Sequence, residues 1–209
     1  EVQEILDGKA SPHRELLNEM MQLARILQTK RIREGSLDFD TQEVRFQLDD
    51  RGFPVATFAK ERLDSMRLIE EFMLLANQTI ARHIGLPGER KIPLPFLYRV
   101  HEPPDKTKLK KFSDFCKALG YPFPLKGIAD SRKFQNLLKK VHGRKEANIV
   151  EEVAIRTMMK ALYSEKNLGH FGLAFTYYTH FTSPIRRYPD LIVHRLLYLY
   201  ENKEVSEKQ

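Results

Sequence analysis

The segment from Thr179 to Arg195, THFTSPIRRYPDLIVHR, carries the side chains best suited to chemistry. Ser183 is a favoured N-cap residue and Pro184 a favoured first helical residue, so the sequence predicts that a helix begins here. Arg186 and Arg187 follow inside the predicted first turn. The unpaired N–H groups of a helix N-terminus favour an anion, and guanidinium groups add planar donors for phosphate oxygens. The segment therefore predicts a site for a phosphate, or for the transition state of phosphoryl transfer.

The rest of this predicted helix has amphipathic spacing. Apolar residues recur at helical intervals and predict a buried stripe of Ile185, Tyr188, Ile192, Leu196 and Leu199. Residues spaced by four form a separate polar row of Arg186, Asp190 and His194. Pro189 lies inside the pattern and is expected to kink the helix or loosen its first turn. An ordinary capped helix with a surface row of charges is the alternative interpretation.

Several other elements are expected to position this segment. One helix is predicted over 11–35, closed by its final glycine, and a longer one over 61–84, whose apolar middle, 69–80, is expected to lie deep. Alternating apolar residues predict a hairpin with strands at 44–48 and 55–58. The later elements are a short strand at 96–100, helices at about 105–119, 130–141 and 147–163, and a strand-like stretch at 173–181. The predicted fold class is α+β, mostly helical in its second half.

The composition, with 42% hydrophobic and 30% charged residues among 209, is that of a soluble globular protein with room for one domain. Cys116 is the single cysteine, so an intramolecular disulfide is excluded. Its helical surroundings favour a small buried apolar role over a nucleophilic one. No run of eighteen apolar residues occurs, and we therefore expect no membrane span and a cytoplasmic protein.

The formal net charge is +7, and basic residues gather in two runs, at 106–111 and 133–145. A basic face suits a polyanion such as RNA, with affinity that falls as salt rises. A plain solvated face explains such runs equally well.

Candidate metal ligands are sparse. Asp38 and Asp40 would point to the same side of a strand and could chelate a cation, although we do not expect a metal site there. The seven histidines include no pair at metal-ligand spacing, and one cysteine makes a zinc site improbable. The sequence therefore predicts no metal site in this chain.

Taken together, these segments resemble the ribonuclease II / ribonuclease R family, the RNB-type 3′-to-5′ exoribonucleases, with the bacterial ribonuclease R branch closest. The 179–195 string matches the family signature, and other matching segments precede it in the family's order: GSLDFD at 35–40, EVRF at 43–46, LIEEFMLLAN at 68–77, LYRVHEPP at 97–104 and GHFGL at 169–173. The resemblance implies that residues 1–209 are the central-to-C-terminal part of one RNB catalytic domain, truncated at both ends, with a deep RNA channel.

The same resemblance implies a processive hydrolase that digests single-stranded RNA from its 3′ end to nucleoside 5′-monophosphates. Two divalent ions, Mg²⁺ by expectation, would activate water and stabilise the leaving oxygen. The family's metal-binding aspartate cluster would lie upstream of residue 1, so the isolated chain is expected to be inactive. A non-catalytic RNA-binding protein with the same fold is the alternative, and a basic helical scaffold without an RNA role is a more distant one.

Roles for single residues follow from matching positions in the family motif. Arg186 takes the place of the arginine that contacts the scissile phosphate, where a fixed cation stabilises developing negative charge. Arg187 is the weaker candidate and is as well placed to pair with Asp190. Ser183, in the same string, is counted among the RNA-binding residues.

Glu70 matches a glutamate close to the ribose of the RNA 3′ end. A carboxylate that accepts a hydrogen bond from a 2′-OH would help to reject DNA. The register against Glu71 stays open, and so does the alternative that both glutamates cap or pair locally, because an unpaired carboxylate is costly to bury.

Aromatic and polar side chains around these positions complete the predicted RNA contacts. Phe39 and Phe46 are candidates for stacking the last base, which any aromatic face can do without regard to sequence. For Phe46 a core role is the stronger interpretation, so Phe39 is preferred. Tyr178 and His180 are expected to line the RNA channel, and their interpretation as strand residues with one buried face is equally open.

Overall fold

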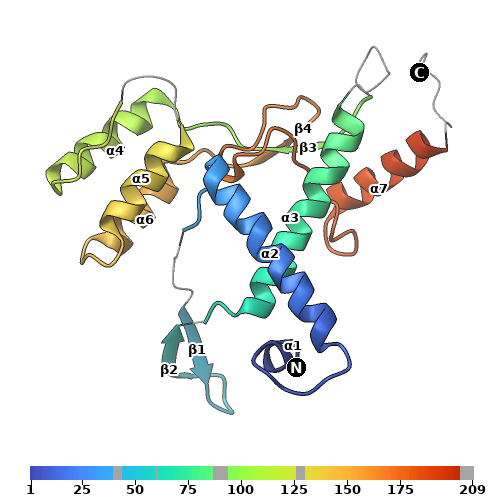
Figure 1. Cartoon of the computed structure of the whole chain (residues 1–209). Helices are drawn as coiled ribbons and strands as arrows, with labels where there is room; N and C mark the ends of the chain where they lie inside the picture. Colours follow the sequence, from blue (N-terminus) through green and yellow to red (C-terminus); the bar gives the residue numbers. More distant parts are fainter. Residues whose placement is uncertain (40–43, 60, 87–93, 126–129, 203–209) are drawn as a thin grey trace.

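The computed structural model describes residues 1–39, 44–59, 61–86, 94–125 and 130–202. Two long helices, α2 (Arg14–Glu34) and α3 (Asp64–Gly85), cross at the centre of the molecule (Figure 1). Around them lie a short helix α1 (Val2–Leu6), a hairpin of β1 (Val44–Leu48) and β2 (Pro54–Ala59), and a helical lobe of α4 (Lys106–Ala118), α5 (Ser131–Val141) and α6 (Ala147–Thr157). The remaining elements are β3 (Tyr98–Val100), β4 (Leu162–Ser164), the 3₁₀ turn η1 (Phe171–Leu173) and α7 (Tyr188–Glu201). This helix-rich arrangement confirms the predicted α+β class.

α2 ends at Gly35, as predicted, because the chain there needs a left-handed residue. Gly35 has φ +112°, its N–H donates to the carbonyl of Ile32 at 3.1 Å, and the N–H of Ser36 donates to the carbonyl of Arg31 at 3.0 Å. The N–H of Leu37 then donates to the carbonyl of Gly172 at 2.8 Å. The end of α2 is thereby fixed against the η1 turn.

The apolar helix α3 lies deep near its C-terminus, whereas its middle, which was expected to lie deep, exposes Ile69, Met73 and Leu75. Ala81 and Ile84 belong to a core shared with β3 and α7, whose other buried members are Phe96, Tyr98, Val100 and Val193. A Cβ on Gly85 would lie 2.5 Å from the Tyr98 hydroxyl oxygen, so only glycine permits this close approach. This core holds the chain on both sides of the Thr179–Arg195 segment.

The helical lobe α4–α6 has a core of its own. The rings of Phe112, Phe123 and Phe134 pack with centroids 4.8 to 5.3 Å apart, and Cys116 is fully buried beside them. Burial raises the pKa of the Cys116 thiol to about 11, which suits the predicted apolar role rather than a nucleophilic one.

Two predicted elements are wrong. The helix expected over 147–163 ends at Thr157, and residues 162–164 instead form β4, which pairs antiparallel with β3. The stretch 173–181 is not a regular strand. Isolated hydrogen bonds hold it, such as the one from the Arg99 N–H to the Tyr178 carbonyl at 2.9 Å. Both differences depend on partners distant in sequence, which local patterns do not record.

The predicted hairpin is confirmed: β1 and β2 pair antiparallel, with a register shift between Gln47 and Leu48. Its described apolar side chains are exposed, because two strands alone have no second layer to cover them. Within the described ranges, no helix combines the length and the apolar composition that crossing a membrane requires.

Candidate functional site

Residues 183–187 form a turn that precedes α7 and is not its first turn. The N–H groups of Arg186 and Arg187 both donate to the carbonyl of Ser183, at 3.3 and 3.0 Å, and α7 begins at Tyr188. The prediction that both arginines sit inside the first turn of a helix is therefore wrong. Arg186 instead lies on an exposed turn just before the helix.

The helix starts late because the segment holds two prolines. A helix from Pro184 would place Pro189 in its interior, where the ring clashes with the preceding turn. A start at Tyr188 places Pro189 in the first turn, where its missing N–H has no cost and no kink results. The predicted buried stripe is also wrong at its start: the Ile185 side chain is fully exposed and Tyr188 is 68% exposed, while Val193 faces the core.

Asp190 anchors the turn from inside the fold. Its side chain is fully buried, and its Oδ1 accepts hydrogen bonds from the backbone N–H of Ser183 at 2.8 Å and from Nη2 of Arg187 at 2.7 Å. The pairing suggested for Arg187 is thus confirmed. The Arg186 guanidinium makes no hydrogen bond or ion pair with any residue that the structure describes.

Two helices hold the backbone that enters the turn. Asn77 of α3, 3% exposed, donates from Nδ2 to the Tyr178 hydroxyl at 3.1 Å and accepts at Oδ1 from the Phe181 N–H at 2.9 Å. His194 of α7 donates from Nε2 to the Phe181 carbonyl at 2.9 Å and stacks on the Phe181 ring. The sequence reasoning did not single out Asn77; the available signal was one amide in an apolar helical stretch, which must find partners when buried.

Tyr178 and His180, predicted together, differ in their surroundings. Tyr178 is buried, with its hydroxyl bonded to Asn77, and this favours the structural alternative for it. His180 is half-buried, with Nδ1 2.7 Å from the hydroxyl of Tyr163, and the Arg99 guanidinium carbon lies 4.8 Å from the centroid of the same ring. His180 therefore belongs to a partly exposed cationic and aromatic group that suits RNA.

The structure separates the two neighbouring glutamates. Glu71 is 4% exposed and forms a buried ion pair, with its Oε1 2.5 Å from Nη2 of Arg31 and its Oε2 accepting from the Arg31 Nε. Arg31 also donates to the Ser36 hydroxyl at 2.7 Å. Glu70 is 36% exposed, and its Oε1 lies farther from the same Arg31 Nη2, at 3.8 Å. Of the two carboxylates, Glu70 is the one that a ligand can reach.

Arg62 joins Glu70 to Asp38. Its Nη2 lies 2.9 Å from Oε2 of Glu70, and its Nη1 lies 2.9 Å from Oδ1 of Asp38. Hydrogen bonds to Glu70 and then to Asp38 raise the pKa of Arg62 above its ordinary value. Asp40 lies outside the described residues, and among the described residues no group of three acidic, histidine or cysteine side chains could hold a metal.

The two predicted stacking residues exchange their expected environments. Phe39 is half-buried and packs against the core of the α4–α6 lobe. Phe46 is 62% exposed on the hairpin, so its interpretation as a core residue is wrong here. Phe46 has the freer ring of the two.

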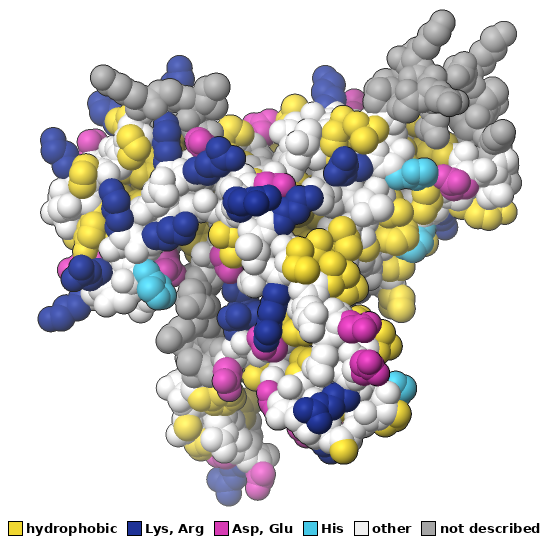
Figure 2. Space-filling model, viewed as in Figure 1, with side chains coloured by type: hydrophobic (Ala, Val, Ile, Leu, Met, Phe, Trp, Pro, Cys, Tyr) yellow, Lys and Arg dark blue, Asp and Glu magenta, His cyan; other side chains and the backbone are white. Residues whose placement is uncertain are grey.

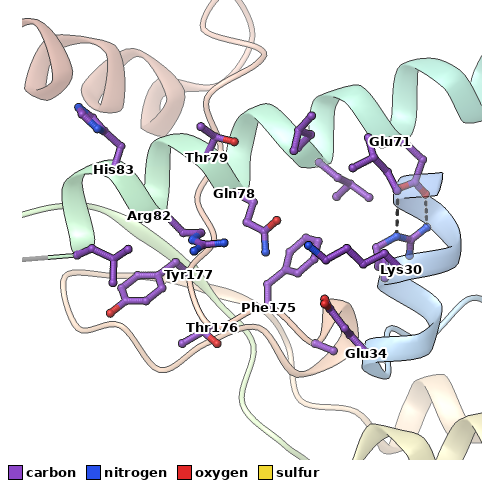
Figure 3. Close-up of a pocket in the computed structure, with 16 residues that line it drawn as sticks. Lys30, Glu34, Glu71, Gln78, Thr79, Arg82, His83, Phe175, Thr176 and Tyr177 are labelled. Atoms are coloured by element: carbon purple, nitrogen blue, oxygen red, sulfur yellow. Dashed lines mark hydrogen bonds and ion pairs between the residues drawn. The ribbon is translucent and has the colours of Figure 1, made fainter. Parts of the chain in front are cut away.

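A pocket of about 920 Å³ lies between α2 and α3, with residues 174–177 along one side (Figure 3). Charged and aromatic side chains line it, including Lys30, Arg31, Glu71, Arg82 and Tyr177. Neither Glu70 nor Arg186 is among the lining residues, although Arg31, which lines the pocket, lies 3.8 Å from Glu70.

The positive charge is concentrated on the α4–α6 lobe. Residues 105–160 contain fourteen Lys and Arg against six Asp and Glu, a net charge of +8, so the rest of the chain has a formal charge of −1. Figure 2 shows Lys and Arg side chains spread over this lobe. Both predicted basic runs therefore belong to this lobe, whose positive charge suits a polyanion.

Two half-buried histidines, His170 and His180, should make stability depend on pH. Burial, then His101 and Arg99, lowers the pKa of His170 to about 3; burial, then Arg187 and Arg99, lowers that of His180 to about 4. In the unfolded chain a histidine titrates near 6.5, so below that pH the unfolded state binds more protons. The contribution is fully present above about pH 6.5 and is lost as the pH falls toward 4 and 3.

We therefore expect the free energy of unfolding to fall between pH 6 and pH 5 by roughly 1 kcal/mol for each such histidine. Urea unfolding at pH 7, 6 and 5 measures this. His170→Asn removes one titrating group while its amide oxygen can still accept from the Leu173 N–H, which now donates to the His170 ring. This variant should show a flatter pH dependence, and an equal slope would contradict the explanation.

Comparisons with known proteins bear on this arrangement. A family model described as the RNB domain matches residues 1–203. Ribonuclease R of Aquifex aeolicus is 45% identical over 183 residues, which make up 88% of this chain and 25% of that protein. The chain thus spans about a quarter of the length of this relative.

Solved structures share the fold. RNase R of Mycoplasma genitalium, in complex with ribose-methylated single-stranded RNA, matches 99% of this chain and 33% of its own with a TM-score of 0.86 and 28% identity. A yeast pseudonuclease matches 100% of this chain and 25% of its own with a TM-score of 0.70, but at 20% identity it shows likeness of fold alone. With the RNB model matched along nearly its whole length, the chain belongs to the RNB domain family and is similar to bacterial ribonuclease R.

Proposed function

We propose that this chain is the arginine-bearing, RNA-channel part of an exoribonuclease that degrades single-stranded RNA processively from the 3′ end to nucleoside 5′-monophosphates. The observation that carries the proposal is the unpaired guanidinium of Arg186 on a turn held by buried side chains. A cation fixed through its backbone needs little reorganisation when charge develops on a scissile phosphate. The RNA-bound relative supports single-stranded RNA as the substrate class.

Other residues would guide the strand. The basic lobe would attract the phosphate backbone, and the exposed ring of Phe46 is free to stack on a base. His180 and Ser183 lie on the segment that leads to Arg186 and would contact the backbone near the cleaved bond.

Mg²⁺ would supply the activated water in the intact enzyme, with ligands from parts of the protein that this chain does not cover. We therefore expect no Mg²⁺-dependent RNase activity from the purified 209-residue chain, because its described residues hold no metal-binding cluster. The measurement is release of nucleoside monophosphate from end-labelled single-stranded RNA, with the intact protein as the positive control. Monophosphate release by the chain alone would show that groups within it do form a metal site.

Glu70 would distinguish RNA from DNA through the 2′-OH near the 3′ end. Its exposed carboxylate is held by Arg62 and could accept that hydrogen bond. In the intact enzyme, Glu70→Ala should reduce the preference for ribose by about 10- to 150-fold, which corresponds to the roughly 1.5–3 kcal/mol of one charge-assisted hydrogen bond. Matched oligomers with ribose or deoxyribose at the last positions measure it.

Glu102→Ala, at an exposed glutamate outside the described ion pairs, is the control and should leave the preference unchanged. A Glu70→Ala enzyme with the original preference would limit Glu70 to its ion pairs with Arg62 and Arg31.

A non-catalytic RNA-binding protein is the second candidate, since a pseudonuclease shares the fold. The intact protein separates the two: RNA binding without monophosphate release in Mg²⁺ would favour the binder.

A further inference from the structure

Asp190 is a buried carboxylate whose two observed hydrogen bonds both go to the turn that carries Arg186. They fasten the first residue of the turn, Ser183, and its last, Arg187, and leave Arg186 between two pinned positions. Burying a carboxylate is costly unless partners compensate it. Here Oδ2 is buried without a hydrogen-bond partner among the described residues, and so is Nε of Arg187. The acid is thus under-compensated for a purely structural ion pair.

We propose that Asp190 is a positioning residue for phosphodiester cleavage: it sets the direction of the Arg186 guanidinium without touching RNA. The inference rests on the proposed function of Arg186. By pairing with Arg187, Asp190 neutralises one of two adjacent cations and leaves the other available to the phosphate. By accepting from the Ser183 N–H, it fixes the backbone from which Arg186 projects. A displacement of about 1 Å in such a group can reduce turnover by about 10².

The test compares four forms of the intact enzyme: wild type, Asp190→Asn, Arg186→Ala and the double variant. Asparagine keeps an acceptor for the Ser183 N–H but weakens the bond to Arg187. We expect Asp190→Asn to lower kcat by about 10- to 100-fold, with KM for single-stranded RNA changed less than about threefold. In the Arg186→Ala background the same substitution should change kcat by less than about twofold, because the group that it positions is gone. Asp64→Asn, at a surface carboxylate paired with Arg25, is the control and should leave kcat unchanged.

Each outcome decides. Equal fold-losses in both backgrounds would show that Asp190 acts independently of Arg186 and would overturn the proposal, as would a normal kcat for Asp190→Asn. If Arg186→Ala alone has normal turnover, the proposed role of Arg186 fails first, and the positioning role fails with it. If Asp190→Asn does not fold, Arg187→Lys takes its place. Arg187 is partly exposed, and the substitution replaces its planar guanidinium, which pairs with Asp190, by a compact ammonium group. Arg187→Lys should lower kcat at least threefold when Arg186 is present and should leave kcat unchanged in the Arg186→Ala background. A normal kcat in the presence of Arg186 would overturn the proposal.

Discussion

Arg186→Ala in the intact enzyme should lower turnover about 10²- to 10³-fold while the affinity for single-stranded RNA changes little. The reason is the contrast between the two arginines of the turn: Arg187 is engaged by Asp190, whereas Arg186 is exposed and unpaired among the described residues. A cation that meets only the developing charge affects kcat more than binding. Single-turnover cleavage and filter binding, measured on the same preparation, separate the two quantities.

Arg195→Ala is the matched control, because Arg195 is an exposed arginine of α7 beyond the turn. It should leave turnover within about twofold. Near-normal turnover in Arg186→Ala would remove the arginine assignment, and a parallel loss of affinity would instead make Arg186 a substrate-binding group.

Glu71→Ala should destabilise the folded chain by about 3–5 kcal/mol, because it removes the close partner of the buried Arg31 guanidinium and leaves only the Glu70 carboxylate, which lies 3.8 Å from Arg31. That is a large fraction of the roughly 5–15 kcal/mol by which domains are stable. Urea unfolding of the variant and the wild-type chain at one pH provides the measurement.

Two further variants control this prediction. Glu152→Ala removes an exposed pair with Arg156 and should change stability by less than about 1 kcal/mol. The double variant Arg31→Met/Glu71→Leu removes both charges and should be more stable than Glu71→Ala, because no buried charge is left alone. A loss below about 1 kcal/mol in Glu71→Ala would show that the pair is not essential to the fold.

The sequence predicted correctly those elements whose bounds depend on neighbouring residues. Gly35 ends α2 where the sequence places it, and α4 and α5 lie within one residue of their predicted bounds. β4 was missed because its strand form depends on β3, some sixty residues earlier. The start of α7 was misplaced because Pro184 and Pro189 both suit a first helical turn. A start at Tyr188 keeps Pro189 out of the helix interior, and the buried hydrogen bond from the Ser183 N–H to Asp190 holds the turn that precedes it.

The sequence indicated which residues are candidates for the site, but not which side chains they contact. Sequence order could not separate Glu70 from Glu71, since their difference comes from Arg31, forty residues away. The role of Asn77 could not be predicted for the same reason, because its two hydrogen bonds join residues more than one hundred positions apart in the sequence. Phe46 alternates like a core residue, but nothing in the described chain covers it.

The net charge is distributed unevenly over the molecule: the α4–α6 lobe has a formal charge of +8, and the rest of the chain is almost neutral. A protein with this charge asymmetry is oriented by the field of a polyanion, so an RNA strand would contact the lobe before it reaches Arg186. Added salt would therefore slow capture of the strand, because it screens the charge of the lobe and reduces the free energy gained when counterions are released. We expect the rate of bond breaking in an already bound strand to stay nearly constant, so that ionic strength would affect RNA capture and not cleavage.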